Sequence, residues 1–327
     1  GAMRDRPRFD VYRGGYEFQM QPDGGRPTKS AWEAFTMNRC KHFPKVLRRA
    51  YRPGLEYGAI CDDGEAVNVF RPPQVAVTQG DVGPFLDLLR RVMPIERDRA
   101  IFLSWCATIV QNPGVKLQWA CVLQGCEGNG KTFLLMCLAH AVGMSASHFP
   151  NPEDLNEKYN TYIEGNLLIG VEEIHMEGRR DMLDRLKKYI TNARVEVRGM
   201  RADKRMTDNL TNWLFLTNYQ DAVVKSKNDR RYAIFFLAQQ AAADLVRDGL
   251  SGDYFPRLWS WARNGGYAAV AGYLRAYQVA AEFDPLGAAH RAPETSSTGA
   301  AIAASMGVIE QLVTEAVEME LPGFRGG

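Results

Sequence analysis

The 327-residue sequence has little net charge and no long hydrophobic run. Its 40 Lys and Arg residues nearly balance 38 Asp and Glu residues, which leaves a formal charge of +2. A polyanionic partner would therefore have to be bound by a local basic patch. No uninterrupted apolar run is long enough to span a bilayer, and the sequence does not open with the pattern of a secretory signal. We therefore expect a cytoplasmic protein with no membrane partner.

Cysteine is also sparse, and its spacing is not that of a metal site. The six cysteines form no CxxC pair, and three of them lie in or beside the apolar stretch 119–140. A zinc site or a disulfide framework is one interpretation. Buried or incidental thiols in a reducing compartment are the other, which we favour. The six are Cys40, Cys61, Cys106, Cys121, Cys126 and Cys137.

Changes in composition and pattern divide the chain into segments, and no internal repeat is present. Gly1-Ala2-Met3 resembles the remnant of a cleaved tag, and the arginine-rich beginning suggests a piece of a longer protein. Between 116 and 240, short apolar runs alternate with helical segments, which is typical of a parallel sheet covered by helices. We expect an α/β fold with segments 1–3 (tag remnant), 4–115 (mixed and helical), 116–240 (α/β core), 241–284 (helical) and 285–327 (linker and acidic terminal helix).

The spacing of apolar residues also predicts individual elements of the first segment. It indicates a helix around Trp32–Ala50 and a short strand at Val67–Phe70. Helical spacing continues over 82–111 and is stopped by Asn112-Pro113-Gly114.

A glycine-rich loop between a predicted strand, Leu117–Leu123, and a predicted helix, Phe133–Val142, matches the pattern G-x-x-x-x-G-K-[ST]. Its glycines allow positive φ angles that turn backbone N–H groups inward, and the following helix directs its positive dipole end at the same point. Lys131 would reach the β- and γ-phosphates, and the Thr132 hydroxyl would bind Mg²⁺. A glycine-rich structural turn is the alternative. We expect ATP to be bound by Gly125, Cys126, Glu127, Gly128, Asn129, Gly130, Lys131 and Thr132.

Two further predicted strands end in polar residues. The apolar run after Asn166 ends in Glu172 and Glu173, which at the carboxyl edge of a parallel sheet would lie beside the γ-phosphate. Glu172 would hold Mg²⁺ through water, and Glu173 would polarise the attacking water. The alternative is a strand that ends in a solvated acidic turn. The strand from Trp213 ends in Asn218, whose amide can bind both the γ-phosphate and that water.

An arginine pair, Arg230-Arg231, precedes the next predicted strand, Ala233–Leu237. An arginine supplied by a neighbouring subunit can stabilise charge in the transition state of phosphoryl transfer. A surface salt bridge is the alternative, which we favour for Arg230.

The segment between the Glu172 strand and the Asn218 strand is strongly basic. An amphipathic helix over Asp181–Ile190 is followed by alternating residues from Val195, a turn, and a returning strand near Lys204. From Arg179 to Arg205 there are ten Lys/Arg residues and four Asp/Glu residues. Such a hairpin can bind DNA phosphates, and a merely solvated charged hairpin is the alternative. Candidate DNA contacts are Lys187, Lys188, Arg198, Arg201, Lys204 and Arg205.

The order of these motifs resembles the superfamily 3 helicases, AAA+-type motors of small viruses, phages and plasmids. It is most similar to the helicase part of phage and plasmid primase-helicases. Flanking segments agree: "NVFRPP" (68–73), "SWCATIVQNPGVKLQ" (104–118) and "APETS" (292–296). The resemblance covers roughly residues 55–300. It implies a P-loop AAA+-like sheet, with the helical region before the loop as the oligomerisation collar.

The resemblance also implies roles for residues. Lys131, Glu172, Glu173 and Asn218 match the phosphate-loop lysine, the acidic pair and the sensor asparagine, and Arg231 matches the arginine finger. In the basic segment, Lys187 or Lys188, Arg201 and Lys204 match DNA-contacting positions. The hairpin tip departs from the family pattern, so the resemblance leaves open which basic residue enters the pore.

The function implied is an ATP- and Mg²⁺-dependent DNA helicase that forms a hexameric ring on single-stranded or forked DNA. No primase motif occurs in the sequence, which would place priming in a further amino-terminal part. A phage or plasmid gene would place the protein in the cytoplasm of a bacterial host. A nucleotide-dependent DNA loader that unwinds nothing is the alternative, and a small-molecule P-loop kinase is a third.

Overall fold

A computed structural model of the chain describes residues 6–40, 46–175, 180–200, 203–223, 225–226, 228–287, 290–305 and 317. Two compact units, residues 1–70 and 71–327, account for most internal contacts. No helix among the described residues is both long enough and apolar enough to cross a bilayer.

The first unit contains two short helices and a small mixed sheet. In this sheet β3 lies between β1, to which it is parallel, and β2, to which it is antiparallel. The buried Asn68 amide of β3 donates to three backbone carbonyls of the 52–56 turn, which fixes that turn over the sheet. The elements are α1 (Arg6–Arg13), α2 (Ala31–Met37), β1 (Arg48–Ala50), β2 (Ile60–Cys61) and β3 (Ala66–Asn68).

The long helix expected over Trp32–Ala50 is wrong. The helix ends at Met37, because Asn38 takes up extended backbone angles (φ −63°, ψ 131°). Arg48–Ala50 forms a strand instead, where it pairs with β3. Pro44 lies inside the predicted helix and lacks the N–H that a helix interior needs.

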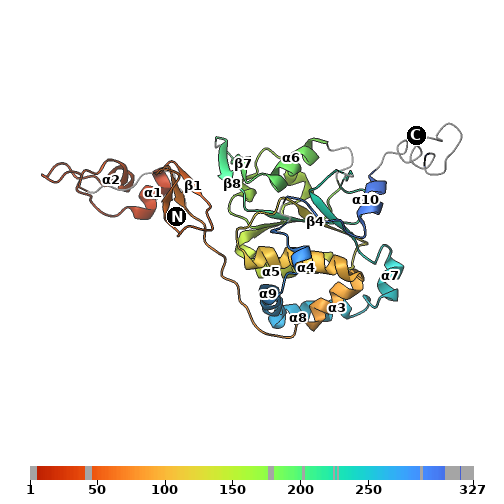
Figure 1. Cartoon of the computed structure of the whole chain (residues 1–327). Helices are drawn as coiled ribbons and strands as arrows, with labels where there is room; N and C mark the ends of the chain where they lie inside the picture. Colours follow the sequence, from red (N-terminus) through yellow and green to blue (C-terminus); the bar gives the residue numbers. More distant parts are fainter. Residues whose placement is uncertain are drawn as a thin grey trace. The chain divides into compact units, whose positions relative to one another are not determined.

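The second unit is built on a five-stranded parallel sheet, which confirms the expected α/β class (Figure 1). Its order is β10-β4-β9-β6-β5, so the strand that precedes the glycine loop lies next to the one that ends at Asn218. The central strands are apolar throughout, as strands covered on both faces must be. They are β4 (Ala120–Gln124), β5 (Ser147–His148), β6 (Leu168–Val171), β9 (Asn212–Thr217) and β10 (Tyr232–Phe236).

Helices cover both faces of this sheet (Figure 1). On one face α4 and α5 contact the strands, and α5 packs on α9. Gly170 of β6 permits a close approach, since a Cβ there would lie 2.5 Å from Leu135 of α5. The helices of this layer are α3 (Gly83–Val92), α4 (Glu96–Gln111), α5 (Lys131–Val142), α8 (Tyr254–Trp261) and α9 (Tyr267–Ala276).

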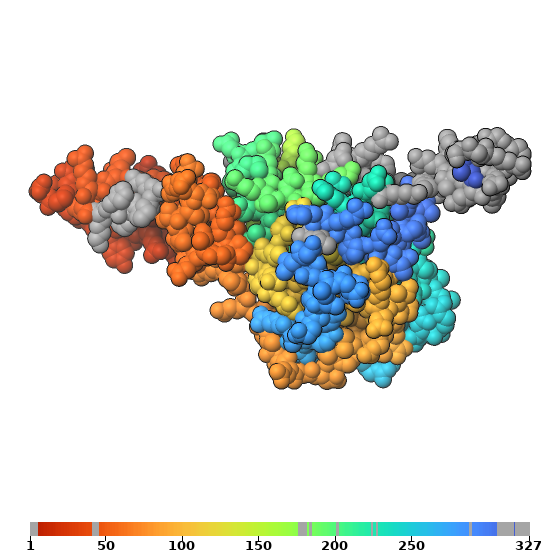
Figure 2. Space-filling view, viewed as in Figure 1, coloured from red at the N-terminus to blue at the C-terminus, as the bar shows by residue number. Residues whose placement is uncertain are grey.

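The opposite face is covered by α6, the hairpin that follows it, and α10. Their buried side chains form one apolar cluster with alternate residues of the sheet. The residues of α6 and the hairpin, coloured green, lie together at one edge of the unit (Figure 2). These elements are α6 (Arg180–Thr191), β7 (Arg194–Val197), β8 (Arg205–Asp208) and α10 (Thr298–Ala304), and a further helix, α7 (Ala242–Arg247), follows β10.

Single turns of 3-10 helix and one π turn connect several of these elements. They are η1 (Met144–Ala146), η2 (Pro152–Asn156), η3 (Thr161–Ile163), η4 (Ala262–Gly266, π) and η5 (Ala281–Phe283).

The segment boundary that we expected at residue 115 differs from the division at residue 70. Both α3 and α4 belong to the second unit, because their apolar faces are buried there. Phe102 of α4, for example, packs edge-on against Phe235 of β10, with 6.0 Å between ring centroids.

The segment expected to be a linker is packed against the outer edge of β10. The Thr295 hydroxyl donates to the carbonyl of Ile234, and the Ser297 hydroxyl accepts from the N–H of Phe236 at 2.8 Å. Both hydroxyl residues are only 6% exposed. Residues 290–305 therefore form a strap along the sheet, and the predicted terminal helix after it lies outside the described residues apart from Val317.

Candidate functional site

The glycine loop joins the carboxyl end of β4 to the beginning of α5, as expected. Gly128 (φ +80°) and Gly130 (φ +97°) take up left-handed angles that favour glycine. The N–H of Gly125 donates to Thr217 of β9, at 3.2 Å, so the loop is attached to the neighbouring strand. The backbone N–H groups of 127–133 donate no hydrogen bond to any described residue. They remain available to an anion at the helix N-terminus.

Lys131 lies inside this loop, with only 8% of the residue exposed. Its ammonium group donates to the carbonyls of Gly125 and Cys126, at 2.7 and 2.8 Å, and to the side-chain oxygen of Asn129 at 3.1 Å. Burial lowers the pKa of Lys131 to about 8. The side chain is thus held over the loop as a cation at neutral pH, where it can meet phosphate oxygens.

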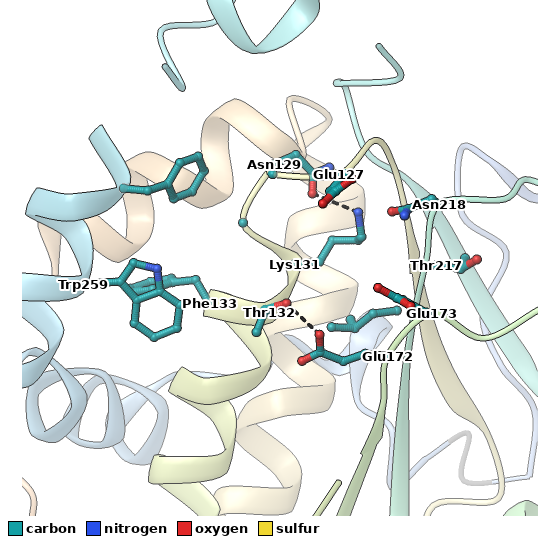
Figure 3. Close-up of a pocket in the computed structure, with 14 residues that line it drawn as sticks. Glu127, Asn129, Lys131, Thr132, Phe133, Glu172, Glu173, Thr217, Asn218 and Trp259 are labelled. Atoms are coloured by element: carbon teal, nitrogen blue, oxygen red, sulfur yellow. Dashed lines mark hydrogen bonds between the residues drawn. The ribbon is translucent and has the colours of Figure 1, made fainter. Parts of the chain in front are cut away.

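The two glutamates follow β6 and lie across the cavity from the loop (Figure 3). The Thr132 hydroxyl donates to the Glu172 carboxylate at 3.0 Å, which joins α5 to the end of β6. Glu173 has a left-handed backbone (φ +54°), which is uncommon for a residue with a side chain. Both glutamates are exposed to the cavity, and so is Asn218 at the end of β9. The structure therefore brings together the residues predicted for one site.

The cavity has a volume of about 340 Å³ and suits a phosphate chain with a small hard cation. Asn129 is fully buried, and its amide N–H₂ has no hydrogen-bond partner among the described residues. Thr132 and Glu172 offer the oxygen ligands that Mg²⁺ prefers. No group of three His, Cys, Asp or Glu side chains in the described ranges could hold a metal by itself. Waters and phosphate oxygens would complete an octahedral Mg²⁺ shell beside Thr132 and Glu172.

A stacked pair beside the acidic residues was not expected from the sequence. The ring of His175, two residues after Glu173, stacks on that of Tyr219, which follows Asn218. The ring centroids are 4.4 Å apart with an interplanar angle of 20°, and His175 lies 3.7 Å from the Asp221 carboxylate. The pair fastens the ends of β6 and β9 to each other. A histidine and a tyrosine in separate loops carry no sequence pattern that would have revealed it.

The two arginines before β10 differ in their surroundings. Arg231 is half-buried, and its guanidinium lies 3.5 Å from the Asp229 carboxylate, which also accepts from the Arg231 backbone N–H. Arg230 is exposed and has no ion pair with a described residue. Neither residue lines the cavity.

The predicted antiparallel hairpin is present, and Val197 pairs with Arg205 at its outer end. Between it and α6 lies a hollow of about 450 Å³, which we call the basic hollow. Six Lys/Arg residues and two Glu residues line it. The cations are Lys158, Arg185, Lys188, Arg194, Arg198 and Lys204, and the acids are Glu157 and Glu196.

The candidate DNA contacts divide into three groups. Lys188, Arg198 and Lys204 line the basic hollow, and Lys204 pairs with Glu196 at 2.8 Å. Lys187 is half-buried outside the lining, and Arg205 pairs with Glu164 at 2.6 Å, away from the hollow. Arg201 lies outside the described residues. Lys158, Arg185 and Arg194 were not among the candidates. Arg185 and Arg194 belong to α6 and β7, whereas Lys158 precedes β6 and only the fold brings it beside the hairpin.

The cysteines form no cross-links. All six thiols are free, and Cys106, Cys121 and Cys137 are buried in the second unit. Cys126 lies in the glycine loop, where its carbonyl accepts from Lys131.

Comparisons with known proteins agree with this architecture. A family of unknown function, DUF5906, matches residues 123–231, which run from the end of β4 to Arg231. No curated protein sequence matches the chain.

Several solved structures of the C-terminal region of NrS-1 share the fold. An apo structure of that region has a TM-score of 0.67 and 17% identity, and the match covers 84% of this chain and 65% of that one. Two A-form apo structures have TM-scores of 0.63 and 0.64 at 16% identity, with 62% and 64% of their length covered. The chain thus spans less than two thirds of these structures. At 16–17% identity, this similarity shows a shared fold alone.

Proposed function

We propose that the chain is the motor part of a ring-forming DNA helicase of a phage or plasmid-like element, driven by ATP hydrolysis. The fold shared with the C-terminal region of NrS-1 is consistent with a helicase-type role, and the motif order resembles that of the superfamily 3 helicases. Single-stranded or forked DNA would be the substrate, and a homo-oligomeric, hexameric ring would be the active form. A primase or polymerase domain would belong to another part of the full-length protein.

The residues of the cavity supply the parts that phosphoryl transfer needs. The loop N–H groups and Lys131 neutralise the β- and γ-phosphates. Thr132 and Glu172 hold Mg²⁺, which would offset charge on the phosphate oxygens. Glu173 accepts a proton from the attacking water, and Asn218 orients that water by hydrogen bonding.

The observation that carries the motor proposal is the path of the chain. From Glu173 it runs directly into α6 and the hairpin, and it returns as β9 to Asn218. Most residues that line the basic hollow therefore belong to an insertion between the two strands whose ends line the proposed ATP cavity. A change at the γ-phosphate can move the hairpin through either end of this insertion.

Measuring ATP hydrolysis with and without single-stranded DNA tests the proposal. A motor should be stimulated by DNA, and Lys131→Ala should abolish hydrolysis because the cation that holds the phosphates is lost. A strand-displacement assay on forked DNA then distinguishes a helicase from a loader. A rate of ATP hydrolysis that single-stranded DNA does not change would contradict the proposal, and so would a folded Lys131→Ala protein with normal turnover.

Two neighbouring arginines could supply the arginine finger of the proposed ring. To reach a neighbouring subunit, Arg231 would have to leave Asp229, whereas Arg230 is already exposed. We keep Arg231 as the candidate finger, since its position next to an aromatic residue matches the family pattern, and treat Arg230 as the comparison variant.

A further inference from the structure

The ATP cavity has an aromatic wall at the end away from its acidic residues. Trp259 and Phe255 of α8 line this end together with Phe133 of α5. In Figure 3, Trp259 and Phe133 lie to one side of Thr132, and Glu173 and Asn218 lie to the other.

The position of the phosphates sets the direction of a bound nucleotide. A γ-phosphate that meets Glu173 and Asn218 places the β-phosphate over Lys131 and the loop N–H groups. The nucleoside must then leave the loop on the opposite side, toward α8. The aromatic wall is the part of the cavity that lies there.

Packing holds the wall in place before any ligand arrives. Phe133 is fully buried and meets Trp259 edge to face, with 5.0 Å between ring centroids. The glycine at 130 lets α8 approach the loop, since a Cβ there would lie 3.0 Å from the Phe255 ring. Tyr254 fastens α8 to α3 through a hydrogen bond to the Asp87 carboxylate, at 3.0 Å.

We infer that Trp259 and Phe255 stack on the nucleobase, and that the site accepts nucleoside triphosphates with little regard to the base. This inference rests on the proposed function of the loop. Every base has a π face, so stacking tolerates all four bases. Discrimination needs polar groups at the base edge, and the polar side chains of the lining come from the loop, from Lys131 and Thr132, and from the strand ends. Purines, with the larger rings, should bind somewhat more tightly than pyrimidines.

Calorimetric titration with MgATP and with magnesium tripolyphosphate tests the stacking directly. In Trp259→Leu the Kd for ATP should rise about tenfold, whereas the Kd for tripolyphosphate, which has no base, should stay unchanged. Trp259→Phe should restore most of the affinity. Tyr277→Leu removes an aromatic ring that follows α9 and does not line the cavity, and should change neither Kd. If Trp259→Leu does not fold, Phe255→Leu serves in its place, with the same selective loss for ATP.

Base tolerance is tested by comparing the Kd of the wild-type chain for ATP, GTP, CTP and UTP. All four should agree within about tenfold. A preference above a hundredfold for one base, or equal losses for ATP and tripolyphosphate in Trp259→Leu, would overturn the inference and leave the motor proposal intact. Unchanged binding of both ligands in Lys131→Ala would instead remove the proposed function of the loop.

Discussion

The exposed cations of the basic hollow predict how steeply the affinity for DNA falls as the salt concentration rises. Lys158, Lys188 and Arg198 line it, are exposed, and have no ion pair with a described residue. Lys204 differs, because Glu196 already neutralises it. The three unpaired cations should therefore be the ones that exchange counterions for DNA phosphates.

The magnitude follows from counterion release. Each phosphate contact with a single strand contributes a slope of about −0.7 to the plot of log affinity against log salt concentration. Replacing all three cations by Gln should make the slope about 2 units shallower. Between 50 and 200 mM salt, the wild-type affinity should then fall roughly twentyfold more than that of the triple variant.

Fluorescence anisotropy with a labelled oligothymidine at four or more salt concentrations measures these slopes. Arg275→Gln is a single-charge control for each position, since it removes one exposed charge from α9, outside the hollow. Its slope should equal that of the wild type. A triple variant with an unchanged slope, or an equal change from Arg275→Gln, would refute the assignment of the hollow to DNA.

Three further predictions concern the ATP cavity and the sheet. Glu173→Gln should bind ATP but hydrolyse it very slowly in a phosphate-release assay, whereas Glu172→Gln should mainly need more Mg²⁺; equally mild effects would contradict both roles. Arg231→Ala should lower turnover on the order of 10³-fold, and mixing it with Lys131→Ala should restore some activity; assembled mixed rings without rescue would exclude a finger at this position. Thr295→Val replaces the hydroxyl by a methyl group and should lower the free energy of unfolding by about 1–3 kcal/mol in denaturant titrations, because a buried carbonyl loses its donor; an unchanged midpoint would show that this hydrogen bond adds no stability.

The cavity proposed to bind ATP could be predicted because its residues follow local rules. A loop with glycines at fixed spacing, and polar residues at the ends of apolar strands, must meet at one edge of a parallel sheet. The sequence therefore indicated Lys131, Thr132, Glu172 and Asn218 without knowledge of the fold. Whether they catalyse hydrolysis stays a prediction.

The aromatic wall and the stacked pair could not be predicted in the same way. Trp259 lies on a helix that is far from the glycine loop in the sequence, and an aromatic residue at helical spacing usually indicates a residue of the hydrophobic core. The contact between His175 and Tyr219 exists only because β6 and β9 are neighbours in the sheet.

The strap was missed for a different reason. Residues 290–305 are rich in alanine, serine and threonine, a composition that is typical of linkers. Their attachment depends on hydroxyl groups that bond to backbone atoms of a distant strand, and hydrophobic periodicity does not report such bonds.

The strap also sets the order in which the second unit can be completed during synthesis. β10 is the edge strand of its sheet, and an edge strand with free backbone groups is a template for pairing with another chain. On the ribosome this edge stays open until the residues near Ser297 have emerged, long after every strand has been made. A polypeptide cut just before residue 290 would keep all five strands of the sheet and the whole cavity beside the glycine loop, yet expose an edge on which copies can associate. Residues 290–305 therefore cover the edge of β10, so that contacts between copies of the unit would have to use other surfaces.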